Sequence, residues 1–171
     1  MSSLTNISSP RRKILVADDN EIILATLSMA LRAEGYEVAT AASGSETISR
    51  MQASRPDLIL LDLAFPPDSR NVTCTLENGF GIIAWLRALG GALNTPIIII
   101  SATEPEEYLH LAQAAGVMTV FQKPVDHDRL LEFIRTTLDG RDPASVRAAD
   151  SAFICTAARA TLNSAQPRQA G

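Results

Sequence analysis

One carboxylate, Asp62, interrupts an otherwise apolar run in the middle of the chain. Its apolar neighbours are Leu58, Ile59, Leu60, Leu61 and Leu63. A short continuous apolar run predicts a strand that is buried on both faces, as at the centre of a parallel sheet. Because burying an ionised carboxylate is costly, we expect Asp62 at the carboxyl end of this strand, where open α/β sheets bind ligands.

Four other polar side chains stand at or just after the ends of predicted strands: Asp18, Asp19, Ser101 and Lys123. Each has an ordinary interpretation on its own, such as a helix cap for the aspartates, a turn residue for the serine and a solvated side chain for the lysine. The carboxyl ends of parallel strands, however, meet at one edge of a sheet. We therefore expect these four residues to converge on Asp62.

Such a cluster predicts phosphoryl chemistry. Carboxylates within about 4–6 Å of one another repel by several kcal/mol per pair, so a cation is expected among them. Oxygen-only ligands favour Mg²⁺, and an aspartate beside Mg²⁺ can attack phosphorus to form an aspartyl phosphate. Lys123 and Ser101 supply the positive charge and the hydroxyl donor that suit the charge on the transferring phosphoryl group.

The hydrophobic pattern predicts five strands that alternate with five helices, and hence a parallel sheet with helices on both faces, a doubly wound α/β fold. The strands are expected at 13–17, 36–40, 57–63, 96–101 and 117–122. The helices are expected at 20–34, 43–54, 80–89, 104–115 and 126–138. A dinucleotide-binding fold would need a glycine-rich turn after the first strand, whereas residues 18–21 are Asp-Asp-Asn-Glu and would repel a diphosphate.

Side-chain types also predict the helix starts and one buried face. Expected caps are Asn20 for the first helix, Ser43 or Ser45 for the second and Asp126 for the last. The first helix is expected to bury the face that carries Ile23, Leu27, Ala30 and Leu31.

Composition limits the class of protein. A chain of 171 residues favours one domain plus extensions, and a net charge of −4 offers no case for nucleic acid. No apolar run approaches the roughly 18–20 residues of a membrane helix, and two cysteines suggest no disulfide framework, so a reduced, cytoplasmic protein is expected. Residues 1–11 are expected to be a disordered leader, and 139–171 a disordered or weakly helical tail.

Over residues 12–138 the chain resembles the receiver domain of two-component response regulators, of the stand-alone single-domain type. The resemblance is carried by residues 14–21 and 57–63, Pro66, Asn78-Gly79, residues 96–102 and residues 121–124. It implies a flavodoxin-like fold with strand order 2-1-3-4-5. It also implies that Asp62 accepts a phosphoryl group from a histidine kinase or a histidine phosphotransfer protein.

The same resemblance assigns the remaining site residues. Asp19 and Asp62 would bind Mg²⁺ directly, Asp18 mainly through water, and Ala64 through its backbone carbonyl. When Asp62 is phosphorylated, Ser101 would donate a hydrogen bond to the phosphoryl group and Lys123 would pair with it.

Three features depart from the family pattern. Val120 stands where an aromatic switch residue is usual, and Phe121 should face the opposite side of the sheet. The loop that contains residues 68–78 is about nine residues longer than is typical, and we expect it to tune partner choice or phosphate lifetime. Ala64 and Thr103 occupy positions that modulate dephosphorylation, and neither carries a charge.

The expected function is a phosphorylation switch rather than an enzyme. Its output is expected to be a protein contact through residues 104–138, with Tyr108 and Leu109 as candidate contacts, or onward phosphotransfer. A phosphorylation-independent binding module of the same fold is the alternative. An aspartyl-nucleophile phosphatase would need a second acid at position 64, where the chain has alanine.

Overall fold

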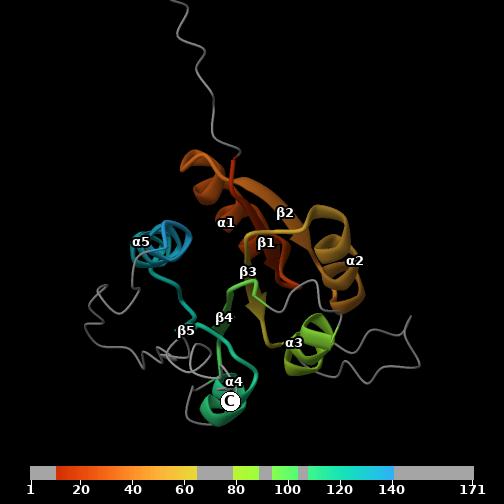
Figure 1. Ribbon diagram of the computed structural model, residues 1–171. Coiled ribbons are helices and arrows are strands. Elements are labelled where there is room, and N and C mark those ends of the chain that lie inside the picture. Colours follow the sequence, from red (N-terminus) through yellow and green to blue (C-terminus); the bar gives the residue numbers. More distant parts are fainter. Residues whose placement is uncertain (1–10, 65–78, 89–93, 104–107, 141–171) are drawn as a thin grey trace, which may run out of the picture.

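The computed structural model describes residues 11–64, 79–88, 94–103 and 108–140. Its five strands form one parallel sheet in the order β2-β1-β3-β4-β5. Helices α1 and α5 cover one face of the sheet, and α2, α3 and α4 cover the other (Figure 1). The predicted doubly wound α/β fold and its strand order are confirmed.

The strands and helices alternate along the chain. The strands are β1 (Lys13–Ala17), β2 (Glu37–Ala41), β3 (Leu58–Asp62), β4 (Ile97–Ser101) and β5 (Thr119–Gln122). The helices are α1 (Glu21–Ala33), α2 (Gly44–Ser54), α3 (Gly79–Ala88), α4 (Leu109–Ala114) and α5 (His127–Leu138). Within the described residues, no helix has the length and apolar character needed to cross a membrane.

Strands β3 and β4 are buried along their whole length, as their apolar runs predict. Successive side chains point to opposite faces of a sheet, so each of these strands contributes to two cores. Ile59 and Leu61 pack in the core beneath α2, α3 and α4, whereas Leu58 and Leu60 pack in the core beneath α1 and α5. Each buried aliphatic side chain stabilises the fold by about 1.5–3 kcal/mol.

Three helices begin at the expected capping residues. The Asn20 side chain accepts hydrogen bonds from the backbone N–H groups of Ile22 and Ile23. Ser43, rather than Ser45, caps α2, and Asp126 caps α5. These caps satisfy backbone donors that have no partner within the helix, and they place the start of each helix at the carboxyl edge of the sheet.

The buried face of α1 is rotated relative to the prediction. Leu27 and Leu31 are buried as expected, but Leu24 and Ser28 complete the buried face. Ile23 and Ala30 are only partly buried. Hydrophobic periodicity missed this rotation because the polar Ser28 lies within the buried stripe.

The last two βα units differ from the prediction at their boundaries. Helix α4 begins at Leu109, because Tyr108 has a non-helical backbone (φ −133°, ψ 4°). Strand β5 begins at Thr119, because Gly116 (φ +65°) and Val117 still close the turn that ends α4 through bonds to Gln113 and Ala112. Strand β2 starts one residue later than expected.

Several predictions fall outside the described residues. They concern the leader before residue 11, the loop at 68–78, the start of the fourth predicted helix at 104–107 and the tail after residue 140.

Candidate functional site

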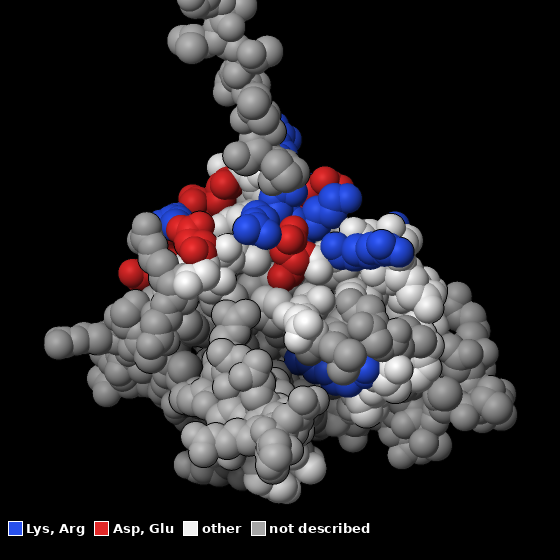
Figure 2. Space-filling model, viewed as in Figure 1, with Lys and Arg blue, Asp and Glu red and all other residues white. Residues whose placement is uncertain are grey.

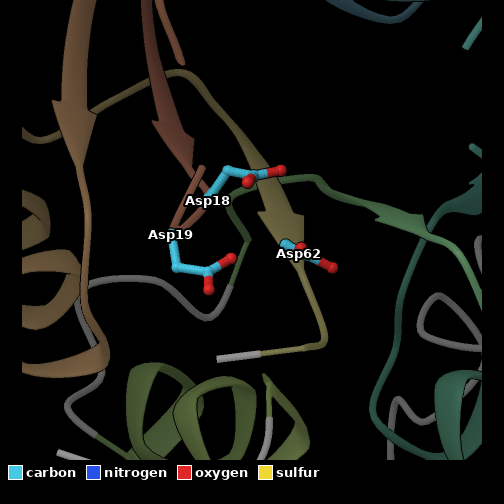
Figure 3. Close-up of side chains that lie close together, drawn as sticks. All are labelled: Asp18, Asp19 and Asp62. Atoms are coloured by element: carbon cyan, nitrogen blue, oxygen red, sulfur yellow. The ribbon is translucent and has the colours of Figure 1, made fainter. Parts of the chain in front are cut away.

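Three carboxylates converge at the carboxyl edge of the sheet. Asp18 and Asp19 follow β1, and Asp62 is the last residue of the neighbouring strand β3. One oxygen from each side chain lies within 4.8 Å of those of the other two (Figure 3). The convergence that the strand ends predict is confirmed for this acidic cluster.

The cluster combines two buried carboxylates with an exposed one. Asp18 is 2 % exposed and Asp62 is 3 % exposed, whereas Asp19 is exposed. The backbone N–H of Asp18 donates to the carbonyl of Ala41 at 3.1 Å, and a side-chain oxygen of Asp18 accepts from the N–H of Asn20 at 2.8 Å. The chain is therefore fixed on both sides of the first carboxylate.

Lys123 brings positive charge to the two buried carboxylates. Its Nζ lies 2.7 Å from Asp62 Oδ2 and 2.8 Å from Asp18 Oδ2. Burial acts to lower the pKa of Lys123, but the hydrogen bonds and charges of Asp18 and Asp62 outweigh it, so the pKa of Lys123 is raised above its usual value. The side chain is therefore a cation that neutralises part of the cluster.

Ser101 ends β4, as predicted, and is fully buried. Its carbonyl accepts from the backbone N–H of Lys123 at 2.8 Å, which fixes the end of β4 beside the lysine. Its Oγ accepts from the N–H of Thr103 at 3.1 Å. A hydroxyl has one donor and two acceptor sites, so accepting this bond leaves its O–H able to donate.

Ala64 lies two residues beyond Asp62. Its backbone N–H donates to Asp62 Oδ1 at 3.1 Å. This turn orients the Asp62 carboxylate, so that one oxygen faces the Ala64 amide and the other faces Lys123.

Gly79 supports the same turn. Its N–H donates to the carbonyl of Leu63 at 3.1 Å, and a Cβ added at position 79 would lie 2.8 Å from both the Asp62 carbonyl oxygen and Leu63 Cα. In the sequence, Asn78-Gly79 was interpreted as the end of the long loop and as part of a family motif. The close approach was not foreseen, because glycine also occurs wherever a turn ends.

Val120 and Phe121 of β5 point to opposite faces of the sheet, and Tyr108 is buried. Val120 is buried beneath α3 and α4, while Phe121 packs on the opposite face against Phe133, with ring centroids 5.8 Å apart. The expectation that Phe121 lies on the opposite face of the sheet from Val120 is confirmed. The expectation that Tyr108 offers a contact surface is wrong: its side chain is 5 % exposed and packs against Phe80 at 5.9 Å.

All the candidate ligands are oxygen atoms, and three of them are carboxylates. A hard divalent cation of the Mg²⁺ type prefers this donor set and tolerates the open side that the exposed Asp19 provides. The residues at the edge of the sheet thus fit the metal that the sequence predicts.

Comparison with known proteins gives the family. The family model described as "Response regulator receiver domain" matches residues 14–135. The chain is 29 % identical over 150 residues to the transcriptional regulatory protein PrrA of Mycobacterium bovis, and 28 % identical over 160 residues to the oxygen regulatory protein NreC of Staphylococcus aureus. These matches cover 88 % and 91 % of this chain, but 59 % of PrrA and 69 % of NreC. The stand-alone arrangement expected from the sequence is therefore not confirmed.

Solved structures show the same architecture. The chemotaxis response regulator CheY4 of Vibrio cholerae has a TM-score of 0.63 at 29 % identity, covering 73 % of this chain and 97 % of its own. A CheY-like receiver domain protein from Methanospirillum hungatei has a TM-score of 0.67 at 26 % identity, covering 76 % and 95 %. With its parallel five-stranded sheet and the match over residues 14–135, the chain belongs to the family of response regulator receiver domains.

Proposed function

We propose that Asp62 is the phosphoacceptor of this receiver domain. In the reaction the phosphorus–nitrogen bond of a phosphohistidine donor breaks, and a bond forms between phosphorus and a carboxylate oxygen of Asp62. The observation that carries the proposal is the position of Asp62, which ends a fully buried strand within 2.7 Å of a lysine ammonium and within the acidic cluster. A carboxylate in that position is oriented before the reaction begins.

Mg²⁺ would be held by Asp19 and Asp62, by Asp18 through water, and by the backbone carbonyl of Ala64. When bound, the metal supplies positive charge that offsets repulsion between the phosphoryl group and the carboxylates. In this proposal the domain assists its own phosphorylation by positioning the metal and Asp62 for reaction with the donor. It is a signalling domain and not an enzyme that turns over a separate substrate.

Lys123 and Ser101 act on the transferred group. Lys123 already contacts Asp62, so its ammonium can follow the developing charge onto the phosphoryl oxygens without a large movement. The hydroxyl of Ser101 retains the donor capacity to hydrogen-bond one of these oxygens. Together they stabilise the negative charge that phosphorylation adds at the edge of the sheet.

The donor that we propose is a histidine kinase or a histidine phosphotransfer protein. We also propose that the domain works in the cytoplasm. The downstream partner is proposed to be a protein that contacts residues 104–138 of the phosphorylated form. In the described part of that stretch, Leu111 of α4 offers an exposed apolar side chain, whereas Tyr108 does not. We propose that the loop at 68–78 tunes partner choice or phosphate lifetime, because its closing residue Gly79 is bonded to Leu63, beside the acceptor.

A second candidate output is regulation of transcription, which the name of PrrA favours. The face of the domain in Figure 2 interleaves positive and negative side chains around the start of β1 and shows no patch of a single sign. Ion pairs such as Arg12–Asp57 and Lys13–Glu37 account for part of this mixture. The described residues on this face therefore offer no uniformly positive surface for DNA, and a protein contact is the primary proposal for the receiver domain.

The decisive experiment is intact-protein mass spectrometry after incubation with acetyl phosphate, with and without Mg²⁺. One Mg²⁺-dependent phosphoryl adduct is expected in the parent protein and none in Asp62→Asn. The matched control is Asp57→Asn, because Asp57 precedes the same strand at its opposite end and contacts Arg12 and the N–H of Lys13 instead of the site. No adduct in the parent protein, with either acetyl phosphate or a phosphohistidine donor, would favour the phosphorylation-independent binding module.

A further inference from the structure

Thr103 connects two side chains through its own backbone. Its N–H donates to the Oγ of Ser101 at 3.1 Å, and its carbonyl accepts from the hydroxyl of Tyr108 at 3.4 Å. The side chain of Thr103 takes no part in either bond. The Ser101 hydroxyl at the edge of the sheet is thereby linked to the aromatic residue that precedes α4.

Tyr108 has little room to move independently of its neighbours, so a displacement of its side chain would also displace the residues around it. Its side chain is almost fully buried, and its ring packs against Phe80 of α3 at a tilt of 54°. It directly precedes Leu109, the first residue of α4, and its own side chain forms no capping hydrogen bond to that helix. A displacement of the Tyr108 side chain would therefore also displace the first residue of α4, to which Tyr108 is joined by a peptide bond.

The opposite end of α4 is fixed to another helix. The guanidinium of Arg87, on α3, donates to the carbonyls of Thr95 and Gly116 at 3.0 Å each and to that of Ala115 at 3.5 Å. Ala115 and Gly116 end α4. A pull on the start of α4 would tilt the helix about this anchored end instead of translating it.

Val120 of strand β5 offers no side-chain hydrogen bond for the same task. Val120, buried in the core that also contains Tyr108, has an aliphatic side chain that cannot donate or accept a hydrogen bond. Of the described residues, Tyr108 is the one whose side chain bonds the segment that carries Ser101 and also adjoins α4.

We propose that Tyr108 is a positioning residue for Ser101 and couples the phosphoryl group to α4. The inference rests on the proposed function, because it requires a phosphoryl group on Asp62. When Ser101 moves to donate to that group, the Thr103 backbone follows and draws the Tyr108 hydroxyl and the start of α4 with it. The hydroxyl, and not only the ring, is the essential part.

The test compares Tyr108→Phe with the parent protein. The substitution removes one hydroxyl and keeps the ring that packs on Phe80. The matched control is Tyr36→Phe, which removes the hydroxyl of the other tyrosine, a half-buried residue just before β2. Hydrogen exchange of residues 109–116 is measured in the presence of Mg²⁺, with and without beryllofluoride, which mimics the phosphoryl group. Labelling of Asp62 by acetyl phosphate is measured in the same samples.

In the parent protein and in Tyr36→Phe, beryllofluoride is expected to change exchange across 109–116. In Tyr108→Phe this change is expected to shrink about two- to tenfold, the range that corresponds to one ordinary hydrogen bond, while Asp62 is still labelled. Comparing each variant with itself, with and without beryllofluoride, removes any general loss of stability. An undiminished response in Tyr108→Phe would refute the inference alone, whereas a parent protein that is neither labelled nor responsive would refute the proposed function.

Discussion

The ammonium group of Lys123 lies between two buried carboxylates, 2.7 Å from Asp62 and 2.8 Å from Asp18, although more than 60 residues separate it from either along the chain. Removing one member of a buried charge group leaves the others uncompensated. The lysine therefore stabilises the metal-free fold. It also competes for the same oxygens that would hold Mg²⁺.

Lys123→Gln is expected to lower the free energy of unfolding by about 1–3 kcal/mol in the absence of metal, because two buried carboxylates then face each other without a cation. Mg²⁺ is expected to restore more stability to this variant than to the parent protein, because the metal no longer competes with the lysine and because stabilisation by a ligand increases with its affinity for the native state. Urea unfolding with EDTA and with Mg²⁺ measures both effects. The control is Lys13→Gln, which removes an exposed lysine 3.6 Å from Glu37. Equal Mg²⁺ effects in all three proteins would contradict the prediction.

Gly79→Ala is expected to weaken Mg²⁺ binding and to slow phosphorylation of Asp62. The added Cβ would meet backbone atoms of Asp62 and Leu63 at 2.8 Å, so the turn that carries the Ala64 carbonyl must shift. Calorimetric titration with Mg²⁺ and the rate of labelling by acetyl phosphate measure the effect, for which at least a tenfold loss, about 1.4 kcal/mol, is expected.

The control for this substitution is Gly35→Ala. Gly35 has φ +89° and nothing within 4 Å of an added Cβ, so alanine there costs about 1–2 kcal/mol of backbone strain without touching the site. Mg²⁺ affinity that falls as much in Gly35→Ala as in Gly79→Ala would show that the effect is one of general stability.

Most of the site was predictable because it depends on strand ends. A continuous apolar run such as β3 is stable only in the interior of the sheet. Asp62, Ser101 and Lys123 lie at or just after the ends of such runs, so the parallel topology brings them to one edge. The acidic pair after β1 joins them for the same reason. No side-chain contact had to be known in advance, since parallel strand order alone decides which residues meet.

The remaining features depend on contacts that residue types do not encode. The hydrogen bonds that connect Ser101 to Tyr108 are made by the backbone of Thr103, so they could not be predicted from a pattern of side chains. Residue 108 was predicted to lie within a helix because Glu104, Glu106 and Glu107 suit a helix start, whereas the backbone of Tyr108 is not helical. One residue of rotation in α1, from Ile23 to Leu24, lies within the error of a periodicity argument.

Arg87→Lys is expected to lower the free energy of unfolding by about 1–2 kcal/mol. The planar guanidinium reaches three backbone carbonyls at once, and a single ammonium cannot reproduce that fork. Urea unfolding gives the loss of stability. Arg50→Lys is the control, because Arg50 forms an exposed pair with Glu46 on α2 and should cost no more than about 0.5 kcal/mol. Similar losses in both variants would argue against an anchoring role for Arg87.

Two exposed apolar side chains lie on one face of α1, the helix that follows Asp18 and Asp19. Ile22 is 76 % exposed and Met29 is 74 % exposed, and residues seven apart share one face of a helix. Ile22 follows Asp19 by three residues, so this face begins within one helical turn of a member of the acidic cluster along the chain. Single exposed apolar side chains are common, but for two on one helix face we expect contact with the proposed protein phosphodonor.

Ile22→Ser and Met29→Ser are therefore expected to slow phosphoryl transfer from an autophosphorylated histidine kinase that is active on the parent protein. Losing one apolar contact of about 1–2 kcal/mol corresponds to a five- to thirtyfold fall in kcat/KM. Labelling by acetyl phosphate should be unchanged, because a small donor needs no docking face. Leu111→Ser, which alters an exposed apolar residue of α4, should leave both rates unchanged. If the α1 variants slowed labelling by acetyl phosphate as much as transfer from the kinase, the defect would lie in the site and not in docking.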